Sequence, residues 1–415
     1  MGTRTFLLGA LLALPLAAGA QNAGWVGSWG ASPLPPSAAT PRFPATPSFA
    51  NQTIRQIVRL SAGGDRLRLR LTNEFGKEPL RIGAARVALA DGTGKLVAGT
   101  ERTVTFGGKG GTTIPAGAPL VSDPVDLRVA DLASLSVSLY FPDDTGQCTC
   151  HQVGLQEAYV SAAGDFTTGV FAPAQTLAQR AFLSGVEVQS SRAKAVVVLG
   201  DSISDGVGST AGANHRWPDL LAERLNARGG HWGVVNHGIS GNRVLADGAG
   251  PSALARLDRD VLSVPGAAYV IVFEGVNDLG RALGPPLPGF GPPPAAGGRP
   301  APLVDPVFGS DLLIDGYRQI IARAHEHGLK VFGATIAPYE GAAYYSADGN
   351  KVREAVNDWI RKSGEFDAVL DFDAALRDPA KPTQIKEGWH AGDHLHGSDA
   401  GYRVVADSID LKLFR

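Results

Sequence analysis

The sequence predicts two domains of different class. An antiparallel β-sandwich is expected over residues 21–188, and a three-layer α/β/α sandwich with a parallel sheet over residues 189–415. In the first part, apolar and polar residues alternate with period two, strictly so in residues 66–71 and 135–141. Such alternation is typical of strands with one buried and one exposed face. In the second part, short apolar runs alternate with amphipathic segments, which indicates strands and helices of a parallel sheet covered on both faces.

The first 20 residues have the pattern of a secretory signal peptide. Arg4 precedes an apolar stretch over residues 6–18, and residues 18–20 are a small-residue cleavage site, so the mature protein is expected to begin near Gln21. The stretch is shorter than the roughly 20 apolar residues that span a bilayer. No later segment is long and apolar enough to do so. We therefore expect a secreted or periplasmic protein without a membrane span.

The composition excludes some classes of protein and leaves other questions open. With 38 Lys and Arg against 40 Asp and Glu, the chain lacks the basic excess of a nucleic-acid binder. The two cysteines, Cys148 and Cys150, are separated by one residue. Export would permit a disulfide, yet so short a loop would strain it, so the pairing stays open. No Cys and His cluster has zinc spacing, and we expect neither a metal nor a cofactor. The sequence does not indicate an oligomeric state.

Turn residues and apolar runs place the elements of both domains. Gly63 and Gly64 separate the runs 57–60 and 66–71, which predicts a β-hairpin. A Pro- and Gly-rich segment over residues 280–308 is expected to be an insertion loop without helix or strand; it is either a lid over the site or a surface excursion. The α/β domain is expected to have strands over residues 195–199, 234–236, 268–273, 329–336 and 368–371, and helices over 216–225, 311–327, 351–362 and 402–414.

Polar residues that suit acyl transfer follow the strands of the predicted parallel sheet, where active sites of such sheets form. Ser202 follows the first strand and is the candidate nucleophile, although it could instead cap a helix. A serine needs a base, and the base needs a carboxylate that sets its tautomer. His396 and Asp393, three residues apart, are the candidates, although Asp393 also suits a turn. His394 is the rival base, but its offset of one residue from Asp393 should point it away.

The tetrahedral intermediate of acyl transfer needs hydrogen-bond donors. The backbone N–H groups of Ser202 and Gly241 and the side-chain amide of Asn277 could supply three of them. Gly241 would allow a close backbone approach because it has no Cβ, although it could be a plain turn residue, and Asn277 could be a loop cap. Four aromatic residues could line the substrate pocket or simply pack: Tyr339, Tyr344, Tyr345 and Trp389.

Four short blocks occur in a fixed order: Gly-Asp-Ser-Ile-Ser at 200–204, Gly-Ile-Ser-Gly at 238–241, Gly-Val-Asn-Asp at 275–278 and Asp-His-Leu-His at 393–396. In this respect the chain resembles the SGNH hydrolases, the GDSL-type esterase and lipase superfamily. The resemblance implies a flavodoxin-like sheet and a serine esterase. It further implies Ser202 as nucleophile, His396 as base and Asp393 as its orienter, with Ser202, Gly241 and Asn277 as the oxyanion hole. The family usually has proline where this chain has Gly397.

Residues 25–29, 51–56 and 216–219 further resemble a secreted two-domain subfamily similar to xylanase-associated esterases. This resemblance implies a short acyl group, acetyl above all, on a carbohydrate, and so a small-molecule or polysaccharide ester as substrate. Two alternatives remain: a lipase- or thioesterase-type acyl hydrolase, and a glycan-binding protein with an inert α/β domain. In the latter case Trp25, Trp29 and Trp232 would stack on sugar rings, although tryptophans are more often core residues.

Overall fold

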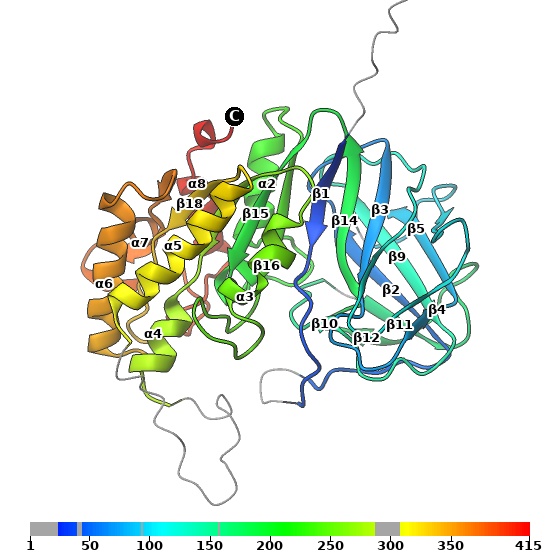
Figure 1. The fold of residues 1–415 in the computed structure, drawn as a ribbon, viewed down its shortest axis with the longest axis horizontal. Helices are drawn as coiled ribbons and strands as arrows, with labels where there is room; N and C mark the ends of the chain where they lie inside the picture. The colour runs from blue at the N-terminus through cyan, green and yellow to red at the C-terminus, as the bar shows by residue number, and fades with distance from the viewer. Residues whose placement is uncertain (1–23, 40–43, 93, 157, 287–307) are drawn as a thin grey trace, which may run out of the picture.

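The computed structural model describes residues 24–39, 44–92, 94–156, 158–286 and 308–415. An antiparallel β-rich domain is followed by an α/β domain with a parallel sheet (Figure 1), which confirms the predicted fold class. The expected signal peptide, residues 1–20, lies outside the described residues. Within the described ranges, no helix has both the length and the apolar character needed to cross a membrane.

Two antiparallel sheets form the N-terminal domain, and their inner faces enclose its core. In strand β3, Leu67, Leu69 and Leu71 are fully buried while the arginines between them are partly exposed, because successive side chains of a strand point to opposite faces. The first sheet has the order β1 (Gly24–Gly30), β14 (Leu183–Ser190), β3 (Arg66–Thr72) and β8 (Pro119–Val121). The second has the order β12 (Pro173–Leu177), β11 (Ala158–Ala163), β2 (Gln52–Arg59), β9 (Ser134–Phe141), β5 (Ala84–Ala90) and β6 (Arg102–Thr103). Two short pairs complete the domain: β4 (Leu80–Ile82) with β7 (Thr112–Ile114), and β10 (Cys150–His151) with β13 (Arg180–Ala181).

The predicted hairpin at Gly63 and Gly64 is wrong. Strands β2 and β3 belong to different sheets, so the chain crosses from one sheet to the other between them. The two glycines allow close packing against a neighbouring segment instead. Gly64 exchanges two backbone hydrogen bonds with Val129, and a Cβ on Gly63 would lie 2.6 Å from the Val129 carbonyl oxygen.

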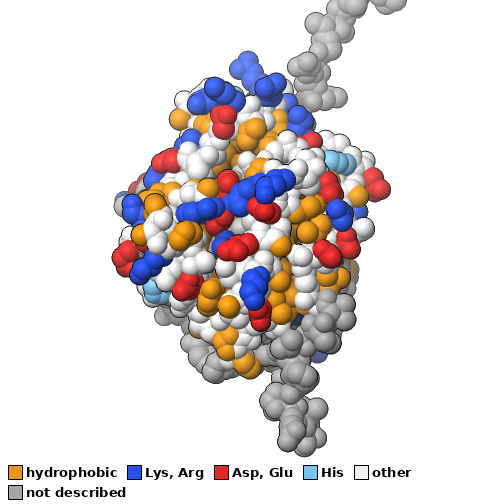
Figure 2. All heavy atoms as spheres, turned by 90° about the vertical axis from the view of Figure 1, so that its left-hand side faces the viewer, with side chains coloured by type: hydrophobic (Ala, Val, Ile, Leu, Met, Phe, Trp, Pro, Cys, Tyr) orange, Lys and Arg blue, Asp and Glu red, His pale blue; other side chains and the backbone are white. Residues whose placement is uncertain are grey.

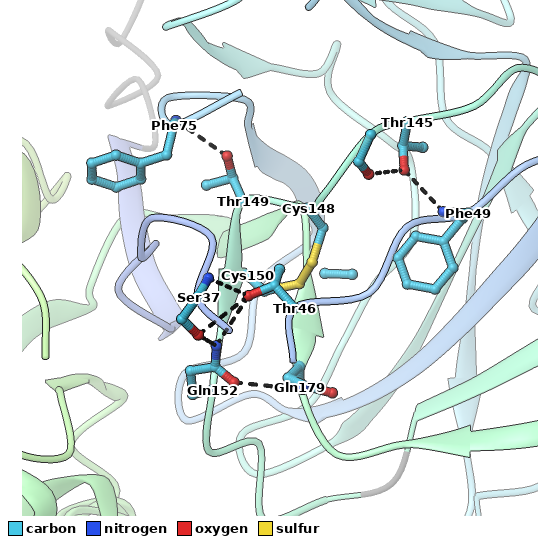
Figure 3. Close-up of a disulfide and its surroundings, with 12 residues drawn as sticks. Ser37, Thr46, Phe49, Phe75, Thr145, Cys148, Thr149, Cys150, Gln152 and Gln179 are labelled. Carbon is cyan, nitrogen blue, oxygen red and sulfur yellow. Dashed lines mark hydrogen bonds between the residues drawn. A yellow bond between two sulfur atoms is a disulfide. The ribbon is translucent and has the colours of Figure 1, made fainter. Parts of the chain in front are cut away.

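Cys148 and Cys150 form a disulfide (Figure 3), the point that the sequence left open. Their Cα atoms are 5.4 Å apart, within the usual range. The surrounding backbone is held as well, since Cys148 N donates to Pro47 O and Leu34 N donates to Cys150 O. Thr149, between the two cysteines, accepts from Phe75 N at 3.1 Å through its hydroxyl (Figure 3). The disulfide therefore restrains the chain immediately before His151.

The parallel sheet of the C-terminal domain has the order 2-1-3-4-5, which is the flavodoxin-like arrangement. The first strand, β15, lies between the second and third, and its residues 195–199 are fully buried. In this topology the chain reverses direction across the sheet beside β15, so a crevice forms at the carboxyl ends of the central strands. The strands, in spatial order, are β16 (Trp232–Gly238), β15 (Lys194–Gly200), β17 (Ala267–Phe273), β18 (Lys330–Ala334) and β19 (Ala368–Leu370).

Helices cover both faces of this sheet (Figure 1). Helices α2 (Trp217–Asn226), α7 (Phe372–Leu376) and α8 (Asp399–Ser408) pack together on one face, and α3 (Ala253–Leu257), α5 (Ser310–Glu326) and α6 (Ala347–Lys362) pack on the other, with α4 (Val276–Leu283) against α6. The remaining elements are α1 (Ser202–Asp205), the π-helical turn η1 (Asp258–Leu262), the pair β20 (Arg377–Asp378) and β21 (Lys381–Ile385), and the 3₁₀ turn η2 (Leu411–Leu413).

Some predicted boundaries in this domain are wrong; for example, the helix expected over residues 351–362 begins at Ala347. The helix expected over residues 402–414 ends at Ser408, because Asp410 caps a new turn by accepting a hydrogen bond from Lys412 N at 2.9 Å. Residues 280–283 were expected in a loop, but they complete helix α4, whose Leu279 and Ala282 are buried. The part of the predicted insertion loop over residues 287–307 lies outside the described residues.

The N-terminal domain covers an edge of the parallel sheet. Strand β1 runs beside the edge strand β16 (Figure 1). Ser61 Oγ accepts a hydrogen bond from Val234 N of β16 at 2.7 Å. Covering an exposed edge in this way removes a template for pairing with other chains. The tryptophans suggested for sugar stacking are mostly interior: Trp29 and Trp232 are 6% and 9% exposed.

The opposite side of the α/β domain faces away from the N-terminal domain. On this side Lys and Arg side chains are interspersed with Asp and Glu and with small apolar areas (Figure 2). This face therefore offers no continuous surface of a single charge.

Candidate active site

Strand β15 ends at Gly200, and the chain turns at once into the short helix α1, which begins at Ser202. Asp201 Oδ1 accepts a hydrogen bond from Ile203 N at 2.9 Å. The aspartate thus caps the helix, and Ser202 does not have to. Burial, reinforced by nearby carboxyl groups, raises the pKa of Asp201 to about 7.

The loop at the far end of the chain brings a base to this serine. His396 Nε2 lies 2.8 Å from Ser202 Oγ, although 194 positions separate the two residues. His396 Nδ1 lies 2.5 Å from Asp393 Oδ2. Both Ser202 and His396 are buried, at 5% and 3% exposed. The structure therefore aligns the three predicted residues in the order serine, imidazole, carboxylate.

Asp393 is held in place by its own loop. Its Oδ1 accepts hydrogen bonds from Leu395 N at 3.1 Å and His396 N at 2.9 Å, so it forms a turn and contacts the imidazole at once. Burial alone would raise the pKa of Asp393, but the bonds from His396 and the backbone keep it well below its usual value. An ionised carboxylate can only accept, so His396 Nδ1 carries a proton. In the neutral ring, Nε2 then has its lone pair directed at Ser202.

His394, the rival base, is directed elsewhere. Its backbone has a φ of +56°, and its ring lies against that of His390, with centroids 4.2 Å apart. A Cβ on Gly341 would come within 2.7 Å of His394 Cγ, so the ring also contacts that turn. This position agrees with the expectation that an offset of one residue turns the side chain away.

The loop that carries His396 is closed by backbone hydrogen bonds. Ala391 N donates to His396 O at 2.8 Å, and Ser398 N donates to Trp389 O at 3.0 Å. Gly397 pairs with His390 in the same bridge. These contacts restrain the loop at the position where the resemblance would have placed a proline.

The three predicted oxyanion donors follow three adjacent strands of the sheet. Ser202 follows β15, Gly241 follows the neighbouring β16, and Asn277 lies in α4, which follows β17. Gly241 has a φ of +81°, a conformation that favours glycine. Asn277 is 4% exposed, and its Nδ2 has no hydrogen-bond partner among the described residues. A buried donor without a partner is costly, so this amide is suited to receive an oxygen of a ligand.

Two neighbours hold Asn277 and its helix. Tyr344 OH donates to Asn277 Oδ1 at 3.4 Å, on the side of the amide opposite its donor. The next residue, Asp278, accepts from Val244 N at 2.8 Å and Leu245 N at 3.1 Å. These bonds join helix α4 to the segment that follows Gly241. Burial raises the pKa of Asp278 to about 6, although the two backbone bonds oppose this rise.

A buried arginine that was not predicted from the sequence contacts the same strand ends. Arg256 is fully buried and pairs with Asp260 at 3.0 Å and Glu274 at 3.2 Å. It also donates to the carbonyl oxygens of Gly200, at the end of β15, and His237, in β16. Burial and the neighbouring Asp201 raise the pKa of Glu274 well above its usual value. Nothing in the local sequence around Arg256 distinguishes it from a surface arginine, because its partners come from other segments.

The domain that contains this site is similar to proteins of a known family. The model of the GDSL-like Lipase/Acylhydrolase family matches residues 198–404. The C-terminal domain therefore matches the GDSL family over most of its length. Its members act as acylhydrolases on esters, so the chain is a hydrolase of that broad class. No curated protein matches the chain.

Several solved structures resemble the GDSL-family domain. A lipolytic protein of the G-D-S-L family from Desulfitobacterium hafniense is 19% identical, with 52% of this chain and 97% of that chain covered and a TM-score of 0.37. An acetylxylan esterase from Geobacillus stearothermophilus is 18% identical, with 54% and 94% covered and a TM-score of 0.38. A lipase/acylhydrolase from Enterococcus faecalis is 19% identical, with 52% and 92% covered and a TM-score of 0.38.

Proposed function

We propose that this protein is a secreted serine esterase that hydrolyses carboxylic esters through an acyl-enzyme on Ser202. The observation that carries the proposal is the alignment of His396 between Ser202 Oγ, at 2.8 Å, and Asp393 Oδ2, at 2.5 Å. A hydroxyl in contact with an oriented, neutral imidazole is an activated nucleophile.

In the first half of the reaction, Ser202 Oγ attacks the ester carbonyl carbon while His396 Nε2 takes the hydroxyl proton. The developing oxyanion is met by the N–H groups of Ser202 and Gly241 and by the amide of Asn277. Loss of one such donor costs about 10²–10³ in kcat. His396 then gives its proton to the leaving alcohol, and the acyl group stays on Ser202.

In the second half, water takes the place of the alcohol. His396 removes a proton from this water as it attacks the acyl-enzyme, and the same donors hold the oxyanion. Collapse of the intermediate releases the carboxylic acid and returns the proton to Ser202 Oγ. Asp393 stays ionised throughout and stabilises the imidazolium that forms in each half.

The substrate we propose is a short acyl ester, acetyl above all, on a carbohydrate. The resemblance to the xylanase-associated subfamily supports the carbohydrate. Tyr344 supports the short acyl group, because it is 5% exposed and contacts Asn277. Its ring also lies against α4, where a Cβ on Gly280 would come within 2.4 Å of it. We infer that this ring limits the length of the acyl chain.

The reaction is tested with a short-chain aryl ester and purified protein. We expect Ser202→Ala to lower kcat by about 10³-fold or more, with an unchanged melting temperature. A covalent serine-directed phosphonate should label the wild type and leave Ser202→Ala unlabelled. Equal turnover by the two proteins would refute the serine mechanism.

The substrate class is tested separately with acetylated xylan, acetylated pectin, feruloyl esters and a series of aryl esters from acetyl to decanoyl. Release of acetate from the polysaccharides, with the highest kcat/KM for acetyl in the series, is expected. A preference for long chains would replace this proposal with a lipase-type or thioesterase-type activity.

Export belongs to the same proposal. The pattern of residues 1–20 supports it, as does the Cys148–Cys150 disulfide, because such bonds persist in oxidising compartments. Expression of the full chain in a bacterium, followed by N-terminal sequencing of the exported protein, should give Gln21 as the first residue. Retention of the intact N-terminus in the cytoplasm would refute it.

A further inference from the structure

One histidine of the N-terminal domain reaches the candidate active site. His151 ends the short strand β10, directly after the disulfide. Its backbone is fixed by the pairing of β10 with β13, in which His151 lies opposite Arg180. Its side chain is buried, at 5% exposed, although nothing in the N-terminal core requires a histidine. The imidazole points into the junction between the domains, where both of its nitrogens find partners.

Both partners of the ring are acceptors. His151 Nδ1 lies 3.0 Å from the backbone oxygen of Ser32, and a carbonyl oxygen can only accept. His151 Nε2 lies 2.9 Å from Asp205 Oδ1, and a carboxylate also accepts. Each nitrogen must therefore donate, which makes the ring an imidazolium. Burial alone would lower the pKa of His151, but the Asp205 carboxylate raises it above its usual value.

Asp205 connects this imidazolium to two parts of the site. It is the last residue of helix α1, which begins with Ser202. Its second oxygen, Oδ2, accepts from Ser240 N at 3.1 Å and from Ser240 Oγ at 2.7 Å. Ser240 immediately precedes Gly241 in the chain. One carboxylate thus clamps the helix of the nucleophile to the loop of an oxyanion donor.

The backbone of the loop also packs closely against helix α1. A Cβ on Gly238 would lie 2.4 Å from Asp205 N, so the backbone at Gly238 packs directly against helix α1. The direction of the Gly241 N–H depends on the peptide between Ser240 and Gly241. Asp205 holds Ser240, the residue at which that peptide begins, through its N–H and its hydroxyl. A displacement of about 1 Å at such a donor can cost about 100-fold in rate.

We propose that His151 is a positioning residue through which the N-terminal domain aligns the oxyanion hole: it holds Asp205, and Asp205 holds the Ser240–Gly241 backbone against the Ser202 helix. The proposal rests on the proposed esterase function. It gives the β-domain a role in the rate of the reaction besides any role in stability. Removing His151 leaves the buried Asp205 carboxylate without its charged donor, so the carboxylate is expected to shift toward other donors or water and to release Ser240.

The test uses the full chain and compares His151→Ala and Asp205→Asn with a matched control. His231→Ala is that control, because His231 Nδ1 also bonds a carboxylate of the N-terminal domain, Asp131, at 2.8 Å. His231 lies just before the start of β16, at the end of the strand away from the site. Removing it deletes another histidine–carboxylate pair between the domains, a more exposed one, without touching the loop of Ser240 and Gly241. For each variant, kcat and KM for a short-chain aryl ester, the inhibition constant of a short alkylboronic acid and the melting temperature are measured.

We expect His151→Ala to lower kcat by about 10- to 100-fold, with KM within about threefold of the wild type. Affinity for the boronic acid, whose adduct is tetrahedral, should fall by a similar factor. His231→Ala should keep both constants within about twofold. In the Asp205→Asn background, His151→Ala should add less than about twofold, because the two residues act as one unit.

Other results would overturn the proposal. These are a kcat for His151→Ala within twofold of the wild type, a loss equal to that of His231→Ala, or effects of His151→Ala and Asp205→Asn that multiply. If His151→Ala does not fold, Ser240→Ala takes its place: it removes one bond to Asp205 and should lower kcat by about three- to tenfold, and an unchanged kcat overturns the proposal. If Ser202→Ala turns over the ester as fast as the wild type, the esterase function itself has failed. If Ser202→Ala is inactive but His151→Ala has the kcat of the wild type, the esterase function is supported and the role of His151 is refuted.

Discussion

Replacing Asp393 by asparagine tests whether the loop sets the tautomer of His396. Asp393 Oδ1 already accepts from the backbone N–H groups of Leu395 and His396. The carbonyl oxygen of an asparagine would keep these two bonds, so its NH₂ group would face His396 Nδ1. That nitrogen would then have to accept, and the ring proton would move to Nε2. Nε2 could no longer take the proton of Ser202.

The size of the effect follows from this change of tautomer. In a serine protease the same substitution preserves the geometry and lowers kcat by about 10⁴, which corresponds to about 5.4 kcal/mol in activation free energy at 1.36 kcal/mol per tenfold. We expect a similar loss here, because the contact between His396 Nδ1 and Asp393 Oδ2, at 2.5 Å, is the one replaced. KM should stay within about threefold, since the proposed ester contacts other residues.

The assay is steady-state hydrolysis of a short-chain aryl ester, with the melting temperature as a check of folding. Asp399→Asn is the matched control: Asp399 pairs with His215 at 2.8 Å in the same part of the chain, and its loss should change kcat by less than about threefold. A folded Asp393→Asn variant that loses less than tenfold in kcat, or no more than Asp399→Asn does, would show that Asp393 does not set the tautomer of His396.

Three further predictions concern the surroundings of the site. Arg256→Met removes the partner of the buried Asp260 and Glu274; we expect a loss of about 3–5 kcal/mol in the free energy of unfolding and a fall of roughly 10 °C in melting temperature, and a fall below 3 °C would contradict this. Asp201 has its pKa raised by burial to about 7, against about 3.9 when unfolded, so between these values the unfolded chain releases a proton that the folded chain keeps. Its contribution is present at low pH and lost as the pH rises through 7; melting curves at pH 5 and 8 should therefore show Asp201→Asn gaining on the wild type at pH 8, and a constant difference would argue against the buried neutral carboxyl. Tyr344→Ala should raise the ratio of kcat/KM for hexanoyl over acetyl esters by about tenfold or more, since each added methylene in an apolar pocket is worth about 1 kcal/mol; an unchanged ratio would show that Tyr344 does not limit chain length.

The strand ends were the part of the site that the sequence could predict. Ser202, Gly241 and Asn277 each follow an apolar strand, and carboxyl ends of parallel strands share one edge of a sheet. The structure places all three there and brings His396 to Ser202, while their catalytic roles stay predictions. The choice between His394 and His396 also followed from local spacing, because a turn of fixed length directs only one of them back to Asp393.

Some elements could not be predicted because their determinants are distant in the chain. Gly63 and Gly64 predicted a hairpin turn, but they lie where the chain crosses from one sheet to the other, and they pack against Val129. Helix α4 continues through Gly280 because Tyr344, far along the chain, packs over it. In each case the glycine shows only that another group can approach the backbone closely. The group that does so comes from a distant part of the chain.

The class of both domains, the order of the four blocks and the candidate residues for ester hydrolysis could all be predicted from the sequence. These are local properties, set by periodicity within each strand or helix and by spacing within each loop. By contrast, the contact of Arg256 with the strand ends and the contact of His151 with Asp205 depend on how distant segments pack. Buried charges need partners, and a folded chain can supply those partners from any part of its length. The identity of a buried ion pair is therefore a property of packing, which no single segment of the sequence contains.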